Sequence, residues 1–247
     1  MDGRKNVKSI VPNIARDYLY VCNDKFRLLQ DKRRRKCVFE SAINKFIENP
    51  IEILNSRNDV ITDLIYGWAN EQWSALDMYL RHCLKHAFVA NGPILECGSG
   101  LTTILLGIIA GLSGNMVWSL EHNQAWGRKV NRYLGKYQIK FVKLIVGQLK
   151  DFGEFMWYDP PLDDMPQGFS MVVCDGPPAG TKGGRFGLLP VMKERLRQGA
   201  VILLDDADRA QENSIALRWT QELKGDYQSL GTINPYIVIS IPHKLTP

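Results

Sequence analysis

Short apolar runs alternate with longer amphipathic stretches through most of the chain. The short runs have the length and composition of buried strands, and they fall at 94–97, 117–121, 141–146, 169–174 and 200–204. Before and between them, apolar residues recur at helical spacing, at 71–90, 101–112, 126–134, 189–196 and 210–223. Two final apolar runs, at 227–231 and 236–241, are close enough to pair as a hairpin.

This alternation predicts an α/β fold. Strands that are apolar throughout and separated by helices indicate a parallel sheet covered on both faces, to which the hairpin adds an antiparallel strand. Residues 1–60 are more polar and helical in pattern, with interruptions at Pro12, Pro50 and Asn58. Because no glycine-rich linker follows, we expect a helical, basic N-terminal extension (1–65) that packs on a main domain (66–247).

The composition is that of an ordinary globular chain. Of 247 residues, 45% are apolar and 23% are charged, which is enough to bury a core. No apolar run approaches the length that spans a bilayer, and the N-terminus lacks the apolar core of a signal peptide. The five cysteines lack metal-type spacing, which favours reduced thiols. We therefore expect a cytoplasmic protein.

The net charge of +5 is unevenly distributed, because residues 32–36 read K-R-R-R-K. A basic run of this kind is able to contact the phosphates of nucleic acid or lipid. The alternative is a helix face that is simply solvated. Both interpretations remain open from the sequence.

The most informative stretch, residues 94–103, reads I-L-E-C-G-S-G-L-T-T. A strand runs into Glu96 and then through Gly98 and Gly100 into an apolar helix. Such a turn brings the backbone close to a ligand and directs free N–H groups at it. A carboxylate at the strand end suits a ligand that carries an ammonium group. The E-x-G-x-G pattern resembles the first motif of class I S-adenosylmethionine (SAM) methyltransferases.

Two other interpretations of this turn remain open. The first is the dinucleotide fingerprint G-x-G-x-x-G, which implies an NAD-dependent oxidoreductase. Its third glycine is replaced by Thr103, and Glu96 would repel a pyrophosphate. The second is a purely structural turn between a strand and a helix.

The resemblance implies a Rossmann-like class I methyltransferase sheet with seven strands, mostly parallel. It also implies a set of SAM-binding residues: Glu96, Gly98, Ser99, Gly100 and Thr102 at the methionine moiety, Trp73 closing over it, Glu121 and His122 at the ribose, Gln148 and Leu149 at the adenine, and Asp175 near the methyl group. For Trp73, packing in the core is an equal alternative. Glu121 ends the second strand, where a carboxylate suits two ribose hydroxyls. Capping of the next helix is the alternative.

Acidic residues follow the fourth and fifth strands, at Asp175 and at Asp205, Asp206 and Asp208. Packing rarely explains charged residues directly after buried strands. Their placement resembles metal-dependent catechol-type O-methyltransferases, which implies Mg²⁺ held by Asp175, Asp205 and Asp206. The chain departs from that family, because Asp-Asp-Ala stands where the family has Asp-Asn. Otherwise Asp175 or Asp205 serves as a general base, and these two are the expected catalytic residues.

Two further segments bear on the acceptor. Asp159-Pro-Pro-Leu162 is similar to the (D/N)-P-P-aromatic motif of amino-group methyltransferases. It ends in leucine and precedes the fourth strand, so we interpret it as a loop, with Trp157 and Tyr158 lining a pocket or packing beneath it. Lys182 and Arg185, around the glycines of 180–184, suggest a mobile basic lid.

These features predict a SAM-dependent methyltransferase that acts on a small hydroxyl-bearing acceptor. The wider set of motifs over residues 60–210 resembles a bacterial group of class I methyltransferases. One alternative is a SAM-binding but catalytically silent module that contacts nucleic acid through residues 32–36. The other is the NAD-dependent oxidoreductase. The sequence identifies neither the acceptor nor the oligomeric state.

Overall fold

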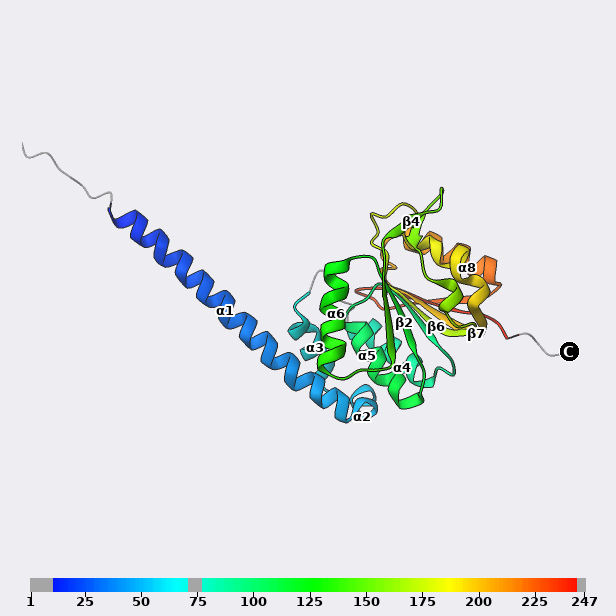
Figure 1. Ribbon diagram of the computed structural model, residues 1–247, viewed down its shortest axis with the longest axis horizontal. Coiled ribbons are helices and arrows are strands. Elements are labelled where there is room, and N and C mark those ends of the chain that lie inside the picture. Colours follow the sequence, from blue (N-terminus) through cyan, green and yellow to red (C-terminus); the bar gives the residue numbers. More distant parts are fainter. Residues whose placement is uncertain (1–10, 71–76, 244–247) are drawn as a thin grey trace, which may run out of the picture.

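Seven strands form one sheet in the order β3-β2-β1-β6-β7-β9-β8, with helices on both faces (Figure 1). The computed structural model describes residues 11–70 and 77–243, with side chains from Arg27 onward. The strands are β1 (Ile94–Cys97), β2 (Val117–Glu121), β3 (Val142–Val146), β6 (Phe169–Cys174), β7 (Leu196–Leu204), β8 (Asp226–Leu230) and β9 (Tyr236–Ser240). The fold class predicted from the sequence is confirmed.

Five strands pair in parallel, and β9 alone runs against the rest, in the final hairpin with β8. β1 pairs in parallel with both β2 and β6, whereas β9 is antiparallel to β7 and β8. The chain moves outward from β1 to β3 and then returns to β6 on the other side of β1. This reversal creates a switch point at the carboxyl ends of β1 and β6, where open α/β sheets bind ligands.

The strands are buried on both faces, because successive side chains enter different hydrophobic cores. Ile94 of β1 lies in one core and its neighbour Leu95 lies in the other. In β6, Met171 and Val172 divide in the same way. β1, β2 and β6 are buried along their whole length, which explains their largely apolar sequence.

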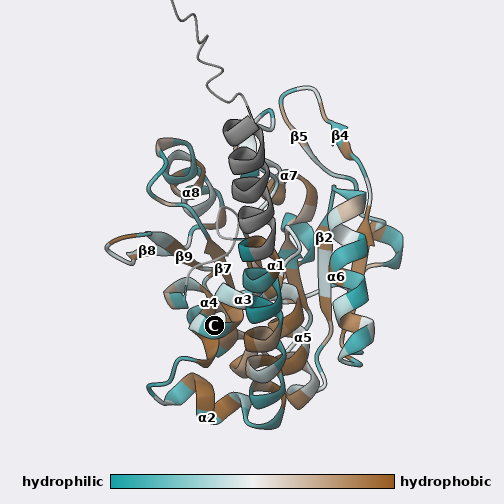
Figure 2. Ribbon diagram, turned by 90° about the vertical axis from the view of Figure 1, so that its left-hand side faces the viewer, coloured by the Kyte–Doolittle hydropathy of each residue, from teal (hydrophilic) through white to brown (hydrophobic). Residues whose placement is uncertain are grey.

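Helices after residue 76 cover the two faces of the sheet. One face packs against α4 (Asp77–Val89), α5 (Leu101–Ser113) and α6 (Gln124–Lys136). The other packs against α7 (Leu188–Met192) and α8 (Ala210–Leu223). Hydrophobic residues predominate in α5 and hydrophilic ones in α6 (Figure 2). α5 is therefore a core helix, whereas α6 borders solvent.

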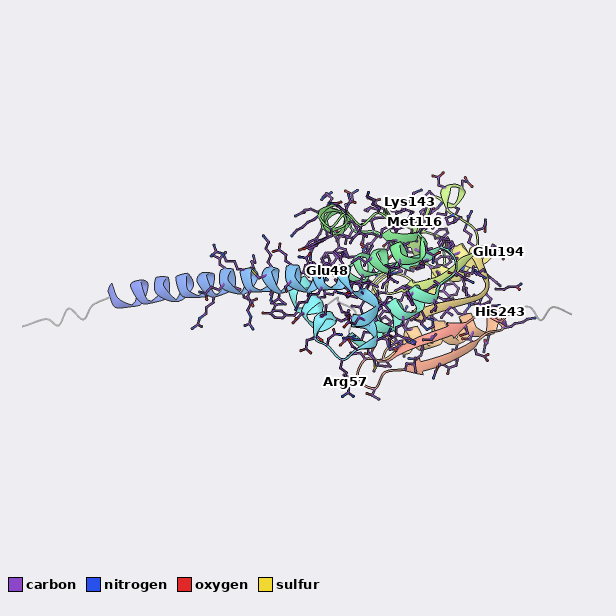
Figure 3. All side chains as sticks on the ribbon, turned by 90° about the horizontal axis from the view of Figure 1, so that it is seen from below. Glu48, Arg57, Met116, Lys143, Glu194 and His243 are labelled. Atoms are coloured by element: carbon purple, nitrogen blue, oxygen red, sulfur yellow. The ribbon has the colours of Figure 1, made fainter. Side chains whose placement is uncertain are left out.

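Three helices precede the sheet: α1 (Val11–Glu48), α2 (Pro50–Asn55) and α3 (Val60–Trp68). Pro12 does not interrupt α1 but lies in its first turn, where a proline needs no N–H partner. The late turns of α1 bury Phe39, Ile43 and Phe46 in the same core as α4 and α5. The earlier turns of α1 project away from the sheet and its helices, whereas Glu48, at the end of α1, lies against them (Figures 1 and 3).

Two local features differ from the prediction. A short hairpin of β4 (Leu149–Asp151) and β5 (Met156–Tyr158) follows β3, and the sequence did not indicate it. Leu196 was assigned to a helix, but it begins β7 after α7 and the 3-10 turn η3 (Lys193–Arg195). Within the described ranges, no helix combines the length and the apolar character needed to cross a membrane.

Candidate functional site

A buried carboxyl group, that of Glu96, lies near the end of β1. Its side chain has no exposed surface, and its Oε2 accepts hydrogen bonds from Ser119 Oγ at 2.5 Å and Thr103 Oγ1 at 2.6 Å. Its Oε1 has no hydrogen-bond partner among the described residues. Burial raises the pKa of Glu96 to about 8, although the two hydroxyl groups partly oppose the shift. The site therefore holds a carboxyl group that needs one further donor.

Thr103 links Glu96 to the glycine turn. Its hydroxyl accepts a hydrogen bond from the backbone N–H of Gly100 at 2.8 Å and donates its own proton to Glu96. A glycine at this position, as in the dinucleotide fingerprint, would remove both interactions. The threonine thus has a specific structural role at the beginning of α5.

Glu121, at the end of β2, is the second buried carboxylate. Its Oε2 accepts hydrogen bonds from the Ser99 hydroxyl at 2.7 Å and the Ser99 N–H at 3.2 Å. Its Oε1 accepts the Asn123 N–H at 2.6 Å and lies 3.3 Å from His122 Nδ1. The next helix, α6, is capped by the side chain of Asn123. The alternative role for Glu121 as the helix cap is therefore filled by another residue.

The glycine turn between β1 and α5 has already committed its backbone donors. The N–H of Gly98 bonds to Leu120 O at 2.9 Å, while those of Ser99 and Gly100 bond to Glu121 and Thr103. A dinucleotide pyrophosphate needs free N–H groups at this position. The geometry of the turn therefore disfavours the dinucleotide interpretation.

Gly98 and Gly176 form a close contact between the ends of β1 and β6. Gly98 has a φ of +95°, and a Cβ there would lie 3.0 Å from Gly176 N. A Cβ on Gly176 would collide with the hydroxyl of Tyr158, which comes from β5. Gly98 is therefore required by its left-handed backbone, and Gly176 is required by the close approach of the Tyr158 hydroxyl.

The Tyr158 hydroxyl was not predicted as part of this site. It is buried, has no hydrogen-bond partner in the described part of the chain, and reaches the Gly98–Gly176 contact. Trp157 is fully buried in the core beneath it. The sequence analysis had allowed either packing or pocket lining for this pair. The missing signal was β5 itself, which is too short to show a strand pattern.

Arg185 joins the acidic residues that follow β6 and β7. It lies in the 3-10 turn η2 (Gly184–Gly187) and is 1% exposed. Its Nη2 contacts Asp206 Oδ2 and lies 3.1 Å from Asp175 Oδ1, and its Nη1 donates to the Asp205 carbonyl at 2.5 Å. Arg185 is therefore an internal counter-ion, and the prediction of a mobile basic lid that included it is wrong.

Two of these acids have raised pKa values. Burial, followed by the neighbouring Asp175 and Asp206 carboxylates, raises the pKa of Asp205 to about 7. Burial also raises the pKa of Asp175, but the guanidinium of Arg185 opposes that shift. At neutral pH, Asp205 is thus poised between its protonated and ionised forms.

The acidic residues do not fit the predicted magnesium ion. The Arg185 guanidinium already lies between Asp175 and Asp206, and Arg209 Nη1 contacts Asp206 Oδ2 at 2.7 Å. Over residues 11–70 and 77–243, no three His, Cys, Asp or Glu side chains are grouped to hold a metal ion. The guanidinium groups of Arg185 and Arg209 supply the positive charge that a metal ion would otherwise bring to these carboxylates.

The other predicted cofactor residues are placed as follows. Thr102 is buried in the first turn of α5, and His122 is partly buried beside Glu121. Gln148 is exposed at the corner between β3 and β4, and Leu149 packs against the core. Trp73 lies outside the described residues.

Comparison with known structures identifies the architecture. The O-methyltransferase of Bacillus cereus in complex with SAH matches with a TM-score of 0.55 at 15% identity, covering 82% of this chain and 99% of that one. TomG of Streptomyces achromogenes, an O-methyltransferase in complex with SAM, gives 0.53 at 15%, covering 76% and 92%. A methyltransferase of Geobacter sulfurreducens gives 0.54 at 12%, covering 82% and 97%.

The chain has the class I methyltransferase fold. No protein-family model and no curated protein sequence matches it. In this fold the carboxyl ends of β1, β2, β6 and β7 share one edge of the sheet, so Glu96, Glu121, Asp175 and Asp205 lie along the same edge.

Proposed function

We propose that this protein binds SAM and transfers its methyl group to a hydroxyl-bearing small molecule. The observation that carries the proposal is the pair of buried carboxyl groups, Glu96 and Glu121, on adjacent strand ends beside the glycine turn. The structural neighbours solved with SAM or SAH support the choice of cofactor, and their description as O-methyltransferases supports oxygen as the methylated atom.

The methionine moiety is assigned to the region of Glu96. A buried acceptor without a partner is costly, and the Oε1 of Glu96 has none among the residues described. The ammonium group of SAM would supply that donor and would favour the ionised carboxylate. The backbone of Gly98, Ser99 and Gly100 and the side chain of Thr102 border this position.

The ribose is assigned to Glu121. Ser99 presents a hydroxyl to its Oε2 at 2.7 Å, which is the interaction that a ribose hydroxyl would make in its place. His122 lies beside this carboxylate, and we assign Gln148 and Leu149 to the adenine. Charge-assisted hydrogen bonds of this kind contribute about 1.5–3 kcal/mol each.

Asp175 and Asp205 are assigned to the acceptor. A general base works best when its pKa lies near the operating pH, and that of Asp205 is raised to about 7. Asp205 would accept the proton of the acceptor hydroxyl, while Arg185 holds Asp175 in place. SAM, when bound, supplies a methyl group that its sulfonium already activates, so the protein mainly aligns the acceptor and excludes water. We derive no step through a metal ion.

Calorimetric titration tests the cofactor assignment. We expect SAM and SAH to bind and NAD to give no signal. Glu121→Gln should weaken SAM binding about tenfold or more, because one charge-assisted hydrogen bond is worth about 1.5–3 kcal/mol. The amide replaces one oxygen that accepts a backbone N–H, so the melting temperature should also fall, and affinity is measured well below the unfolding transition.

Glu52→Gln is the matched control, since Glu52 is an exposed residue of α2, away from the strand ends. It should leave SAM affinity unchanged. Equal affinity of the wild type and Glu121→Gln would remove the ribose assignment. NAD binding in place of SAM would overturn the proposed function itself.

A further inference from the structure

The positive charge of the chain is concentrated in one segment. From Asn123 to Lys150 there is no acidic residue, whereas the basic residues are Arg128, Lys129, Arg132, Lys136, Lys140, Lys143 and Lys150. Most of this segment forms α6 and the edge strand β3. These seven positive charges exceed the net charge of +5 of the whole chain, so the remaining residues together carry a small net negative charge.

The fold brings the basic run of α1 beside this segment. Lys136 of α6 forms an ion pair with Glu40 of α1 at 2.6 Å. The rings of Phe39 and Tyr133 pack edge to face with centroids 5.3 Å apart. The basic run of α1 therefore ends beside the last turn of α6, about a hundred residues later in the sequence.

The basic side chains on these helices are largely directed to solvent. Lys36 lies one turn before Glu40, at 4.0 Å, and Lys32 and Arg33 lie one turn earlier on the same side of α1. These residues are exposed, as are Arg128 and Arg132 of α6. Arg35 differs, because it turns toward α3 and lies over the ring of Tyr66.

A groove of about 300 Å³ adjoins these residues between α6 and β3. Its walls include Gln124, Arg128 and Asn131 from successive turns of α6, opposite Leu144 and Val146. Amide and guanidinium groups are the side chains that hydrogen-bond to the edges of nucleic-acid bases. The groove lies between α6 and β3, and its lining includes none of the acidic residues that follow β6 and β7.

We propose that Lys32, Arg33, Lys36, Arg128 and Arg132 form a basic surface that binds the phosphodiester backbone of a nucleic acid. Two acids of α1 beside these residues are already paired, Glu40 with Lys136 and Asp31 with Arg35. The groove beside it carries amides, which suit nucleotides rather than acyl chains. The basic run of α1 is only half of this surface, and the half on α6 becomes evident from the fold.

Fluorescence anisotropy with labelled oligonucleotides tests the proposal. Single-stranded RNA, single-stranded DNA and duplex DNA of one length are titrated at salt concentrations from about 50 to 400 mM, because phosphate contacts make the affinity fall steeply with salt. We expect Arg128→Gln/Arg132→Gln to lower single-strand affinity roughly 10- to 30-fold at about 0.1 M salt and to flatten the logarithmic salt slope by about 1.4. Lys32→Gln/Arg33→Gln should do the same.

The control is Arg57→Gln/Lys85→Gln, which removes the same charge from exposed residues elsewhere. Arg57 lies on the side of the molecule opposite to α6 and Lys143 (Figure 3). The control should bind like the wild type. Equal losses in all three variants, no binding by the wild type at the lowest salt, or binding to phosphatidylserine vesicles and not to oligonucleotides would overturn the proposal. None of these outcomes depends on SAM binding.

Discussion

Glu96 couples the proposed cofactor site to proton uptake. Its pKa is about 8 in the folded protein, so the carboxyl group is mostly protonated at pH 7. A ligand ammonium group favours the ionised form and therefore lowers this pKa on binding. The sequence predicted the position of the acid, but its protonation state depends on burial and on Ser119 and Thr103, which only the fold brings to it.

We expect SAM binding at pH 7 to release up to one proton per site. Calorimetry in two buffers of different ionisation enthalpy measures this number directly. Because the free carboxyl loses its proton near pH 8, the apparent affinity should rise with pH toward about 8 and fall at higher pH, where the ligand ammonium loses its own proton. Glu96→Gln should abolish both effects. A proton count of zero in the wild type would show that Glu96 does not meet the ammonium group.

The sequence was least informative about Arg185. Its carboxylate partners, Asp175 and Asp206, are separated from it by ten and twenty-one positions, and no short-range pattern connects them. The residue follows the glycine pair Gly183-Gly184, which suggests mobility when the sequence is considered alone. In the fold, burial lowers the pKa of Arg185, but the neighbouring carboxylates outweigh this effect and raise it. Removing one partner of a buried ion pair is strongly destabilising, because the other charge stays buried without a partner.

At the scale of elements, the close contact between the ends of β1 and β6 gives a packing test. Gly176→Ala places a methyl group against the Tyr158 hydroxyl, and we expect a loss of about 1–3 kcal/mol in the free energy of unfolding. Tyr158→Phe removes that hydroxyl and should restore part of the loss. Urea denaturation of the two single variants and the double variant measures the coupling.

Gly180→Ala is the control from the same loop, because no other atom lies within 4 Å of a Cβ at Gly180. It should be close to neutral. If Tyr158→Phe restores nothing, the obstacle is the backbone of Gly98 and not the hydroxyl.

Most elements could be predicted because their signal is local. α8 (Ala210–Leu223) and β2 (Val117–Glu121) coincide with the predicted ranges, since each carries a continuous periodic or apolar pattern. β4 and β5 have three residues each, which is too short for any period to appear. Leu196 continued an apparent helical spacing, but the structure makes it the beginning of β7.

At the scale of the whole molecule, the late turns of α1 belong to the core of the sheet. Phe46 is fully buried in one cluster with residues of α4, α5 and β1. We expect Phe46→Ala to lower the free energy of unfolding by about 3–5 kcal/mol, as large-to-small changes in cores do. Circular dichroism and tryptophan fluorescence should report one coincident transition, because helices and sheet share this core.

Leu28→Ala on the projecting part of α1 is the control. Leu28 is 62% exposed, so its truncation should change stability by less than about 0.5 kcal/mol. An early separate transition in Phe46→Ala would instead identify the first three helices as an independent unit. The parallel sheet and its final hairpin were predictable from the alternation of strands and helices. The path of the long helix α1 was not, since no break in its sequence pattern separates the turns that project from the turns that enter the core.

The fluorescence of Trp126 is expected to report on the glycine turn. Its indole Nε1 donates a hydrogen bond of 2.7 Å to the carbonyl of Ser99, within the glycine turn. Its ring also lies against Trp68 and Lys129, so its emission depends on a defined local environment. A ligand that displaces Ser99 changes the indole hydrogen bond and hence the fluorescence. Rapid-mixing experiments on the unlabelled protein can therefore follow the arrival of a ligand in real time, a rate that equilibrium titration does not give.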